Sequence, residues 1–282
     1  MPADAAIVRS LLFAPAARPE RFDKAVAAGA DAVIVDLEDA VAPQDKDDAR
    51  RQALPWFRRD AAGDVLRCLR VNSPRTAHGL RDLLALVDTG TLPDLLMIPK
   101  VESAEELDVI DQVLAGPARA IGFLALVESA RGLAAAERIA AHPRTRALVL
   151  GGADLAADLG AAFAWEPLLW ARGRLVQAAA TAGISAIDVP WLALDDDAGL
   201  EAEAVAVRRL GCTGKLAVHP RHVATINAVF TPAEDDVARA QRIVSADDAA
   251  HGGVCLVDGR MVDAAVVRAA RRTLARAARW CR

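Results

Sequence analysis

Two carboxylates stand just beyond neighbouring apolar runs of the sequence, a position from which side chains can do chemistry. Glu128 directly follows "LALV", and Asp154 follows "ALVLGGA" one repeat later along the chain. If these runs form adjacent strands, the two carboxylates meet, and such a pair cannot stay ionised at close range without a cation. The two acids therefore either share a proton or hold a metal ion.

The donor atoms of this pair favour a hard cation. No Cys or His stands beside either acid in the sequence, and Mg²⁺ takes one or two carboxylates while keeping waters and accepting substrate oxygens. The acids of "DLED", which are Asp36, Glu38 and Asp39, would then hydrogen-bond the waters of the ion. The two glycines of "GGAD" allow the backbone to approach the substrate and the metal closely.

The elements that must position these acids are short apolar runs that alternate with longer Ala-, Leu- and Arg-rich segments. Strands that are apolar on both faces and separated by helices indicate a parallel sheet covered by helices. This pattern over residues 1–230 fits an α/β fold with a closed (β/α)₈ TIM barrel better than an open doubly wound sheet, whose G-x-G-x-x-G is missing after the first run. The eight runs are "SLLFAP", "AVIVDLED", "VLRCLRVN", "LLMIPKVE", "AIGFLALVES", "ALVLGGADL", "SAIDVP" and "GKLAVHP".

Nearly every one of these runs ends in polar side chains. The carboxyl ends of the strands of a barrel open on one mouth, where active sites lie, so we expect the polar residues to gather there. Any one of them could instead cap the following helix, as Ser129 or Asp154 could. The residues of this set are Asp36, Glu38, Asp39, Arg70, Asn72, Lys100, Glu102, Glu128, Ser129, Asp154, Asp188 and His219.

Residues 231–282 follow a different pattern and are expected to form a C-terminal extension. A helix is predicted from about Pro232 to Ser245, and "GGVCLVDGRMVD" is typical of a short hairpin or loop. The segment "AAVVRAARRTLARAARW" predicts an amphipathic terminal helix. This extension either packs on the barrel or contributes to the site of a neighbouring subunit.

Composition limits the class of partner. The chain has 282 residues, of which 54% are hydrophobic, and a net charge of -4, which indicates a globular protein that binds neither nucleic acid nor a membrane. Its four scattered cysteines lack zinc-ligand spacing, which favours reduced thiols in the cytoplasm. The first apolar run stops at Pro15, too early for a signal peptide, and no run approaches the ~20 residues of a membrane span.

Several motifs together resemble one known family, the citrate lyase beta-subunit-like proteins of the HpcH/HpaI aldolase group, which includes citryl-, malyl- and citramalyl-CoA lyases. The resemblance covers nearly the whole chain. It implies a Mg²⁺-dependent lyase, assembled as a homotrimer or hexamer, that performs reversible Claisen cleavage of a 3-hydroxyacyl-CoA thioester to acetyl-CoA and a keto acid. The motifs are "RSLLFAPAARPERFDKA", "GADAVIVDLEDAVAPQDKDDAR", "LRVNSP", "MIPKVES", "ALVESARGL", "GGADLAADLG", "GKLAVHPRHVATIN" and "VDGRMVDAAVVRAARR".

The same resemblance implies roles for individual residues. Glu128 and Asp154 are expected to bind the magnesium ion, and Arg70 is expected to contact the reacting end of the substrate. Asp263, the acid of "MVD", is expected to act as an acid or base in the mouth of a neighbouring subunit. Contacts with coenzyme A or the substrate are expected from Arg18, Arg21, Lys24, Lys46 and Pro220.

Other readings of the same residues remain open. Arg70 could merely pair with Glu38 or Asp39, and Asp263 could merely cap the terminal helix. The chain could be a class II aldolase acting on free hydroxy-keto acids, although such an enzyme has no thioester for the basic residues to cradle. It could also catalyse a malate-synthase-like condensation or a thioester hydrolysis, or act only as a beta subunit in a citrate lyase complex with an acyl carrier protein.

Overall fold

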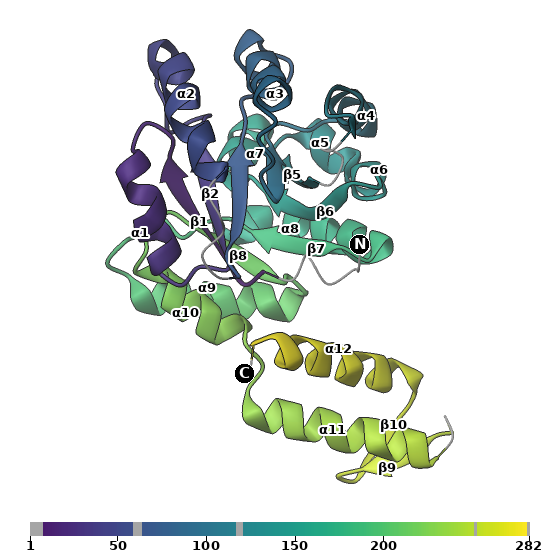
Figure 1. Ribbon diagram of the computed structural model, residues 1–282. Coiled ribbons are helices and arrows are strands. Elements are labelled where there is room, and N and C mark those ends of the chain that lie inside the picture. The colour runs from purple at the N-terminus through teal and green to yellow at the C-terminus, as the bar shows by residue number, and fades with distance from the viewer. Residues whose placement is uncertain (1–7, 59–63, 117–120, 251–252, 281–282) are drawn as a thin grey trace. The chain divides into compact units, whose positions relative to one another are not determined.

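The computed structural model describes residues 8–58, 64–116, 121–250 and 253–280. Eight parallel strands are hydrogen-bonded in chain order and closed into a barrel by the pairing of the first with the eighth (Figure 1). The predicted TIM barrel is therefore confirmed, and each strand overlaps the apolar run that predicted it. The strands are β1 Ser10–Pro15, β2 Ala32–Asp36, β3 Leu66–Arg70, β4 Leu95–Ile98, β5 Gly122–Val127, β6 Thr145–Leu150, β7 Ser185–Asp188 and β8 Gly214–Ala217.

Helices follow the strands and cover the outside of the barrel. Several of them begin at a side chain that accepts a hydrogen bond from the backbone N–H three residues later, and Ser129 is such a cap. The helices of this part are η2 Pro19–Arg21, α1 Phe22–Ala27, η3 Pro43–Asp45, α2 Lys46–Phe57, α3 Ala77–Thr89, α4 Ala104–Val113, α5 Ala130–Ala134, α6 Ala136–Ala140, α7 Gly152–Leu159, α8 Trp165–Ala182, α9 Asp197–Leu210 and α10 His222–Phe230.

The side chains inside the barrel form one apolar cluster. Because side chains of a strand alternate between its two faces, every second residue points inward. Each fully buried Leu, Ile or Val contributes about 1.5–3 kcal/mol to the stability of the fold. The buried members of the cluster are Val8, Leu11, Ala32, Ile34, Cys68, Leu95, Met97, Leu124, Leu126, Ala147, Val149, Ile187 and Leu216.

The same alternation corrects one expectation about the mouth. Ile187 of β7 belongs to the inner cluster, so Asp188 points outward, toward the helices. Its carboxylate accepts hydrogen bonds from Arg172 Nε at 2.8 Å and from Lys215 Nζ at 2.8 Å, and all three side chains are buried. Asp188 therefore stabilises the contact between barrel and helices, and the prediction that it lies at the mouth is wrong.

The chain divides into two compact units, residues 1–227 and residues 228–282. The second unit contains α11 Glu234–Ala249, the antiparallel hairpin of β9 Cys255–Val257 and β10 Arg260–Val262, and α12 Ala264–Trp280. It has its own apolar cluster, in which Ala240 and Ile243 of α11 pack with Val262, Val267 and Ala270. A helix, a hairpin and a terminal helix thus follow the order that the sequence predicts.

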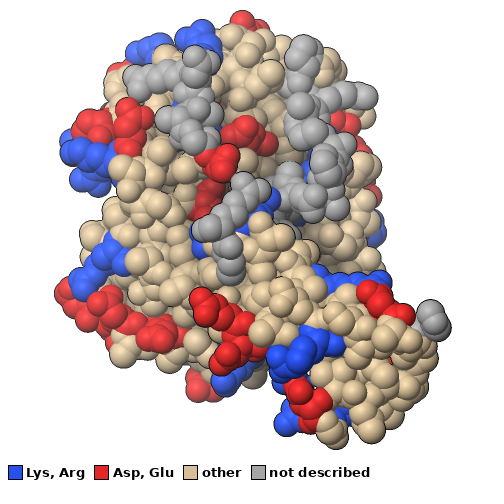
Figure 2. All heavy atoms as spheres, turned by 60° about the horizontal axis from the view of Figure 1, so that its bottom comes forward, with Lys and Arg blue, Asp and Glu red and all other residues tan. Residues whose placement is uncertain are grey.

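Charged side chains of both signs are mixed on the molecular surface. Figure 2 shows acidic and basic residues in small groups close together on the face that it displays. A mixture of this kind produces no extended field of one sign on that face. Among the helices that the structure describes, none combines the length and the apolar character needed to cross a lipid bilayer.

Candidate active site

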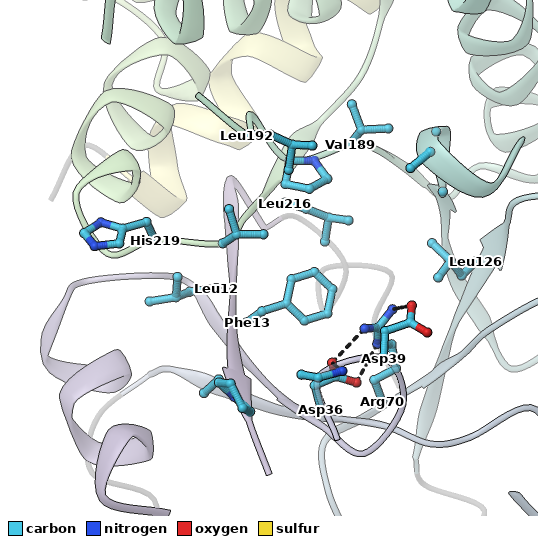
Figure 3. A pocket seen from close by; sticks show the side chains of 18 of the residues that line it. Leu12, Phe13, Asp36, Asp39, Arg70, Leu126, Val189, Leu192, Leu216 and His219 are labelled. Atoms are coloured by element: carbon cyan, nitrogen blue, oxygen red, sulfur yellow. Dashed lines mark hydrogen bonds and ion pairs between the residues drawn. The ribbon is translucent and has the colours of Figure 1, made fainter. Parts of the chain in front are cut away.

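The carboxyl ends of the barrel strands surround a cavity of about 750 Å³ (Figure 3). Its lining continues the inward-facing positions of the strands: Leu126 is followed by Glu128, and Ile34 by Asp36. The mouth therefore brings together most of the predicted site residues. The predicted residues that line the cavity are Arg21, Lys24, Asp36, Asp39, Arg70, Glu128, Asp154, His219 and Pro220.

Apolar side chains make up much of the remaining wall. The ring of Phe13 lies over the guanidinium of Arg70, whose central carbon is 4.8 Å from the ring centroid (Figure 3). A wall of this kind excludes water and strengthens charge interactions inside the cavity. None of these apolar residues was singled out from the sequence, although the inward positions of Phe13, Leu126 and Leu216 on their strands could have indicated those three. They include Leu12, Phe13, Leu126, Leu150, Phe163, Val189, Leu192, Leu216 and Val218.

Glu128 is buried at the end of β5, with 4% of its surface exposed. One carboxylate oxygen, Oε1, accepts a hydrogen bond of 2.7 Å from the backbone N–H of Lys100. Burial, together with the negative charges of Glu38 and Asp154, raises the pKa of Glu128 to about 8, against the opposing effect of Lys100. A carboxylate whose pKa is raised in this way binds either a proton or a cation, as the sequence predicts for the pair of Glu128 and Asp154.

Asp154 lies in the first turn of α7, and its charge acts on Glu128. It does not cap that helix, because the N-cap position is Gly151 and no side chain caps the helix there. Across the described residues, no group of three or more His, Cys, Asp or Glu side chains is arranged to hold a metal ion. The candidate cation site thus consists of two carboxylates, whose remaining ligands must be water or substrate oxygens.

Gly151 lies against Glu128 and leaves it room. A Cβ atom at this position would clash with Cβ and Oε2 of Glu128, so only glycine fits beside the carboxylate. We expect Gly151→Ala to displace Glu128 and to lower kcat by about 10²-fold, as misplaced catalytic groups do. Steady-state kinetics would measure this. The control is Gly173→Ala in α8, where an added Cβ meets nothing within 4 Å; an equal loss there would contradict the prediction.

Arg70 joins the acids that follow β2. Its Nε and Nη2 each donate a hydrogen bond of 2.7 Å to Asp36, and Nη1 lies 3.6 Å from Asp39 Oδ2 (Figure 3). Nη1 also lies 3.0 Å from Glu38 Oε2. Burial alone would lower the pKa of Arg70, but these carboxylates raise it above its usual value. The guanidinium is therefore a permanent cation, held rigidly at the cavity wall by the pairing that the sequence left as an alternative.

Lys100 links two of these acids, although it does not itself line the cavity. Its Nζ donates a hydrogen bond of 2.7 Å to Glu38 Oε1, while its backbone N–H holds Glu128. Burial alone would lower the pKa of Lys100, but Glu38 and Glu128 raise it. Sequence reasoning placed Lys100 among the polar strand-end residues and gave it no role in the site. Its partners come from two other strands, and no local pattern could have indicated them.

Two of the residues predicted to contact the coenzyme or the substrate do not line this cavity. Arg18 is exposed and does not line the cavity. Lys46 is buried at the start of α2, where its Nζ donates hydrogen bonds to the carbonyl oxygens of Leu37, at 3.0 Å, and Glu38, at 2.9 Å. The structure therefore places Lys46 beneath the loop that carries the β2 acids and commits its ammonium to that loop.

This position of Lys46 leads to a prediction about stability. Lys46→Met should lower the free energy of unfolding by about 1–3 kcal/mol, because it leaves two buried carbonyl groups without a donor. The Michaelis constant for the substrate should stay within about twofold of wild type, since Lys46 does not reach the cavity. Thermal melts and kinetics would measure both. Lys24→Met, which changes a residue in the cavity wall, is the comparison. The prediction would be contradicted if Lys46→Met weakened substrate binding and Lys24→Met did not.

Asp263 belongs to the second unit, where it precedes α12. Its Oδ1 accepts hydrogen bonds from the backbone N–H groups of Ala265, at 2.9 Å, and Val266, at 3.0 Å. These bonds lower its pKa. Asp263 is thus an ionised cap of the terminal helix within its own unit.

The chain matches family models and known proteins over most of its length. A family model described as HpcH/HpaI aldolase/citrate lyase matches residues 9–220, and one described as C-C bond lyase of the TIM-barrel fold matches residues 176–281. An L-malyl-CoA/beta-methylmalyl-CoA lyase of Rhodobacter capsulatus is 36% identical, covering 95% of this chain and 94% of the relative. A (3S)-malyl-CoA thioesterase of Cereibacter sphaeroides is 35% identical over the same shares.

Solved structures give the same picture. CitE from Mycobacterium tuberculosis, in complex with magnesium, acetoacetate and coenzyme A, is 34% identical, with a TM-score of 0.81 over 98% of this chain and 99% of that one. RipC from Yersinia pestis is 41% identical, with a TM-score of 0.73 over 82% of this chain and 98% of its own.

Proposed function

Because the chain belongs to the HpcH/HpaI aldolase/citrate lyase family, we propose that it cleaves a 3-hydroxyacyl-CoA thioester into acetyl-CoA and a keto acid. The family resemblance predicted from the motifs is confirmed, and the chain is a carbon–carbon lyase. The observation that carries the proposal is the buried carboxylate of Glu128 beside Asp154, in a largely apolar cavity that also holds the cation of Arg70.

Magnesium fits the two carboxylates. Glu128 and Asp154 supply only oxygen atoms, the burial of Glu128 beside like charges calls for a compensating cation, and Gly151 leaves space next to Glu128 Oε2. The CitE relative holds magnesium together with coenzyme A. Magnesium bound at this pair supplies Lewis acidity and a template for the hydroxyl and carboxylate oxygens of the substrate. Asp36, Glu38 and Asp39 then contribute to the negative field around the ion while they fix Arg70.

The protein's own side chains account for the rest of the chemistry. As the carbon–carbon bond breaks, its electron pair passes to the thioester fragment, which becomes an enolate. The rigid guanidinium of Arg70 faces the cavity and stabilises the developing negative charge, an effect of about 3–4 kcal/mol for one preorganised donor. Asp263 of a neighbouring subunit, once it has taken up a proton equivalent to the one that the substrate hydroxyl gives up on becoming the keto group, transfers that proton to the enolate carbon. The basic residues Arg21 and Lys24, at the edge of the cavity, bind the coenzyme phosphates.

The pKa of Glu128 predicts how cation binding depends on pH. Protonated Glu128 cannot bind Mg²⁺, so the proton and the cation compete for the carboxylate. Since its pKa is about 8 in the free protein, the apparent dissociation constant for Mg²⁺ should rise by about tenfold for each pH unit below 8 and level off above pH 8. Calorimetric titrations from pH 6 to pH 9 would measure this, and a dissociation constant that is flat below pH 8 would contradict the prediction.

One second activity has specific support. Hydrolysis of the thioester uses the same metal and the same cavity, and a (3S)-malyl-CoA thioesterase is among the relatives. For a class II aldolase and for a subunit that depends on an acyl carrier protein, the support is the description of the family and the name of a similar structure, a citrate lyase beta subunit of Mycobacterium tuberculosis. We further propose that the enzyme works in the cytoplasm, which the spacing of its cysteines favours, and that it forms a homotrimer or hexamer, as the family resemblance implies.

A substrate panel tests the proposal. The purified chain would be incubated with Mg²⁺ and citryl-, malyl-, methylmalyl- or citramalyl-CoA, while keto acid, acyl-CoA and free coenzyme A are measured. Release of a keto acid together with an acyl-CoA supports the lyase, and release of free coenzyme A with no keto acid supports hydrolysis. Turnover that persists in EDTA would exclude the magnesium site, and cleavage only of carrier-bound substrate would indicate dependence on a complex.

A further inference from the structure

Glu38 is a further acid near the candidate cation site, and it is buried, but both of its oxygens are engaged by cations. Its surface is 6% exposed. Oε1 accepts a hydrogen bond of 2.7 Å from Lys100 Nζ, and Oε2 lies 3.0 Å from Arg70 Nη1. Although its charge acts on Glu128, Glu38 does not line the cavity. Its position therefore depends on the two cations that hold it.

Lys100 is locked in place by its backbone. Its φ angle is 56°, in the left-handed region that residues other than glycine seldom adopt. Its N–H donates to Glu128 Oε1, and its carbonyl oxygen accepts a hydrogen bond of 2.7 Å from Arg75 Nη2. Residues with such a backbone often occur at functional sites, where the surrounding contacts enforce it. Here the strained backbone orients one residue toward two acids from different strands.

The carboxylates around the cavity make the position of Glu38 important for cation binding. Five carboxylates lie near the candidate cation site, and one of them, Glu38, is paired with the cations of Arg70 and Lys100. A released Glu38 would be a third carboxylate available to a cation. Calcium prefers six to eight oxygen ligands, whereas magnesium works with one or two carboxylates and leaves positions for substrate.

We propose that Lys100 is a positioning residue that holds Glu38 away from the cation, so that Glu128 and Asp154 remain the only carboxylate ligands and the other coordination positions stay open for substrate. This inference rests on the proposed magnesium site. By fixing the position of Glu38, Lys100 then influences which cation the site prefers and how much room the substrate has beside that cation.

The test is calorimetric titration of the full-length chain with MgCl₂ and with CaCl₂, without substrate. Lys100→Met removes the ammonium and keeps the backbone N–H, and Lys100→Gly also relieves the left-handed backbone. Either variant should bind Ca²⁺ at least about tenfold more tightly than wild type, with a smaller gain for Mg²⁺, because a third carboxylate joins the ligands. With Mg²⁺ present, the Michaelis constant for the thioester should rise more than kcat falls, since Glu38 occupies a position meant for substrate.

Two double variants separate ligation from simple charge. Adding Glu38→Gln to Lys100→Met should return Ca²⁺ affinity to the wild-type value. Adding Asp39→Asn instead restores the same net charge but leaves Glu38 free, so Ca²⁺ binding should stay tight. If both double variants return to wild type, or if folded Lys100 variants bind Ca²⁺ no more tightly than wild type, the proposal is overturned. A wild-type chain that binds no Mg²⁺ overturns the metal site itself, and this inference with it.

Discussion

Replacing Glu128 by glutamine should lower kcat/KM for thioester cleavage by about 10³-fold and abolish calorimetrically detectable Mg²⁺ binding. The amide keeps the size of the side chain and can still accept the hydrogen bond from the Lys100 N–H. It loses the negative charge that the cation needs. Because the burial of this charge is unfavourable, as the raised pKa shows, the melting temperature of Glu128→Gln at pH 9 should equal or exceed that of wild type.

This combination of lost function and retained stability separates a metal ligand from a structural residue. The matched control is Glu137→Gln, an exposed helix residue whose partner is Arg174, and it should keep both Mg²⁺ binding and turnover. Substantial turnover by Glu128→Gln in the presence of Mg²⁺ would contradict the assignment. A large drop in melting temperature would instead indicate that Glu128 supports the fold.

The barrel could be predicted from the sequence because parallel strands buried on both faces leave continuous apolar runs. The run "AVIVD" became β2, and "GKLA" became β8 and closed the barrel against β1. No contact in space had to be known for this, since the length and composition of each run carry the signal. The extension was predicted in the same way, from the change of pattern after residue 230.

The residues of the mouth were predicted less completely. The point where a strand ends says where its last residues lie, but not whether their side chains point into the barrel or out of it. Alternation along β5 turns Glu128 inward, whereas the same alternation turns Asp188 of β7 outward. Counting from the apolar residues of β7 would have excluded Asp188. No such count reveals the partners of Lys46 or Lys100, because each side chain is long enough to reach groups on another segment.

Replacing Asp263 by asparagine should lower kcat by about 10²–10⁴-fold if this acid exchanges the proton of the enolate. Asparagine caps helices as well as aspartate does, so the hydrogen bonds from the N–H groups of Ala265 and Val266 should persist and the melting temperature should hardly change. Asp263→Ala is the comparison. It should lose the same activity and about 1 kcal/mol of stability as well, whereas equal turnover by Asp263→Asn and wild type would reduce Asp263 to a cap.

Mixing inactive subunits tests where Asp263 acts. In a cyclic homo-oligomer, the Glu128→Gln subunit still offers an intact Asp263, and the Asp263→Asn subunit still offers an intact barrel. If the acid serves a neighbour, one site in four is complete after random assembly of equal amounts, so activity should recover to about a quarter of wild type. If each Asp263 serves its own barrel, no mixture contains a complete site and activity stays at the level of the separate variants. Size-exclusion chromatography of differently tagged subunits would confirm that the subunits exchange. Once exchange is confirmed, a failure of activity to recover is evidence that Asp263 does not act across an interface.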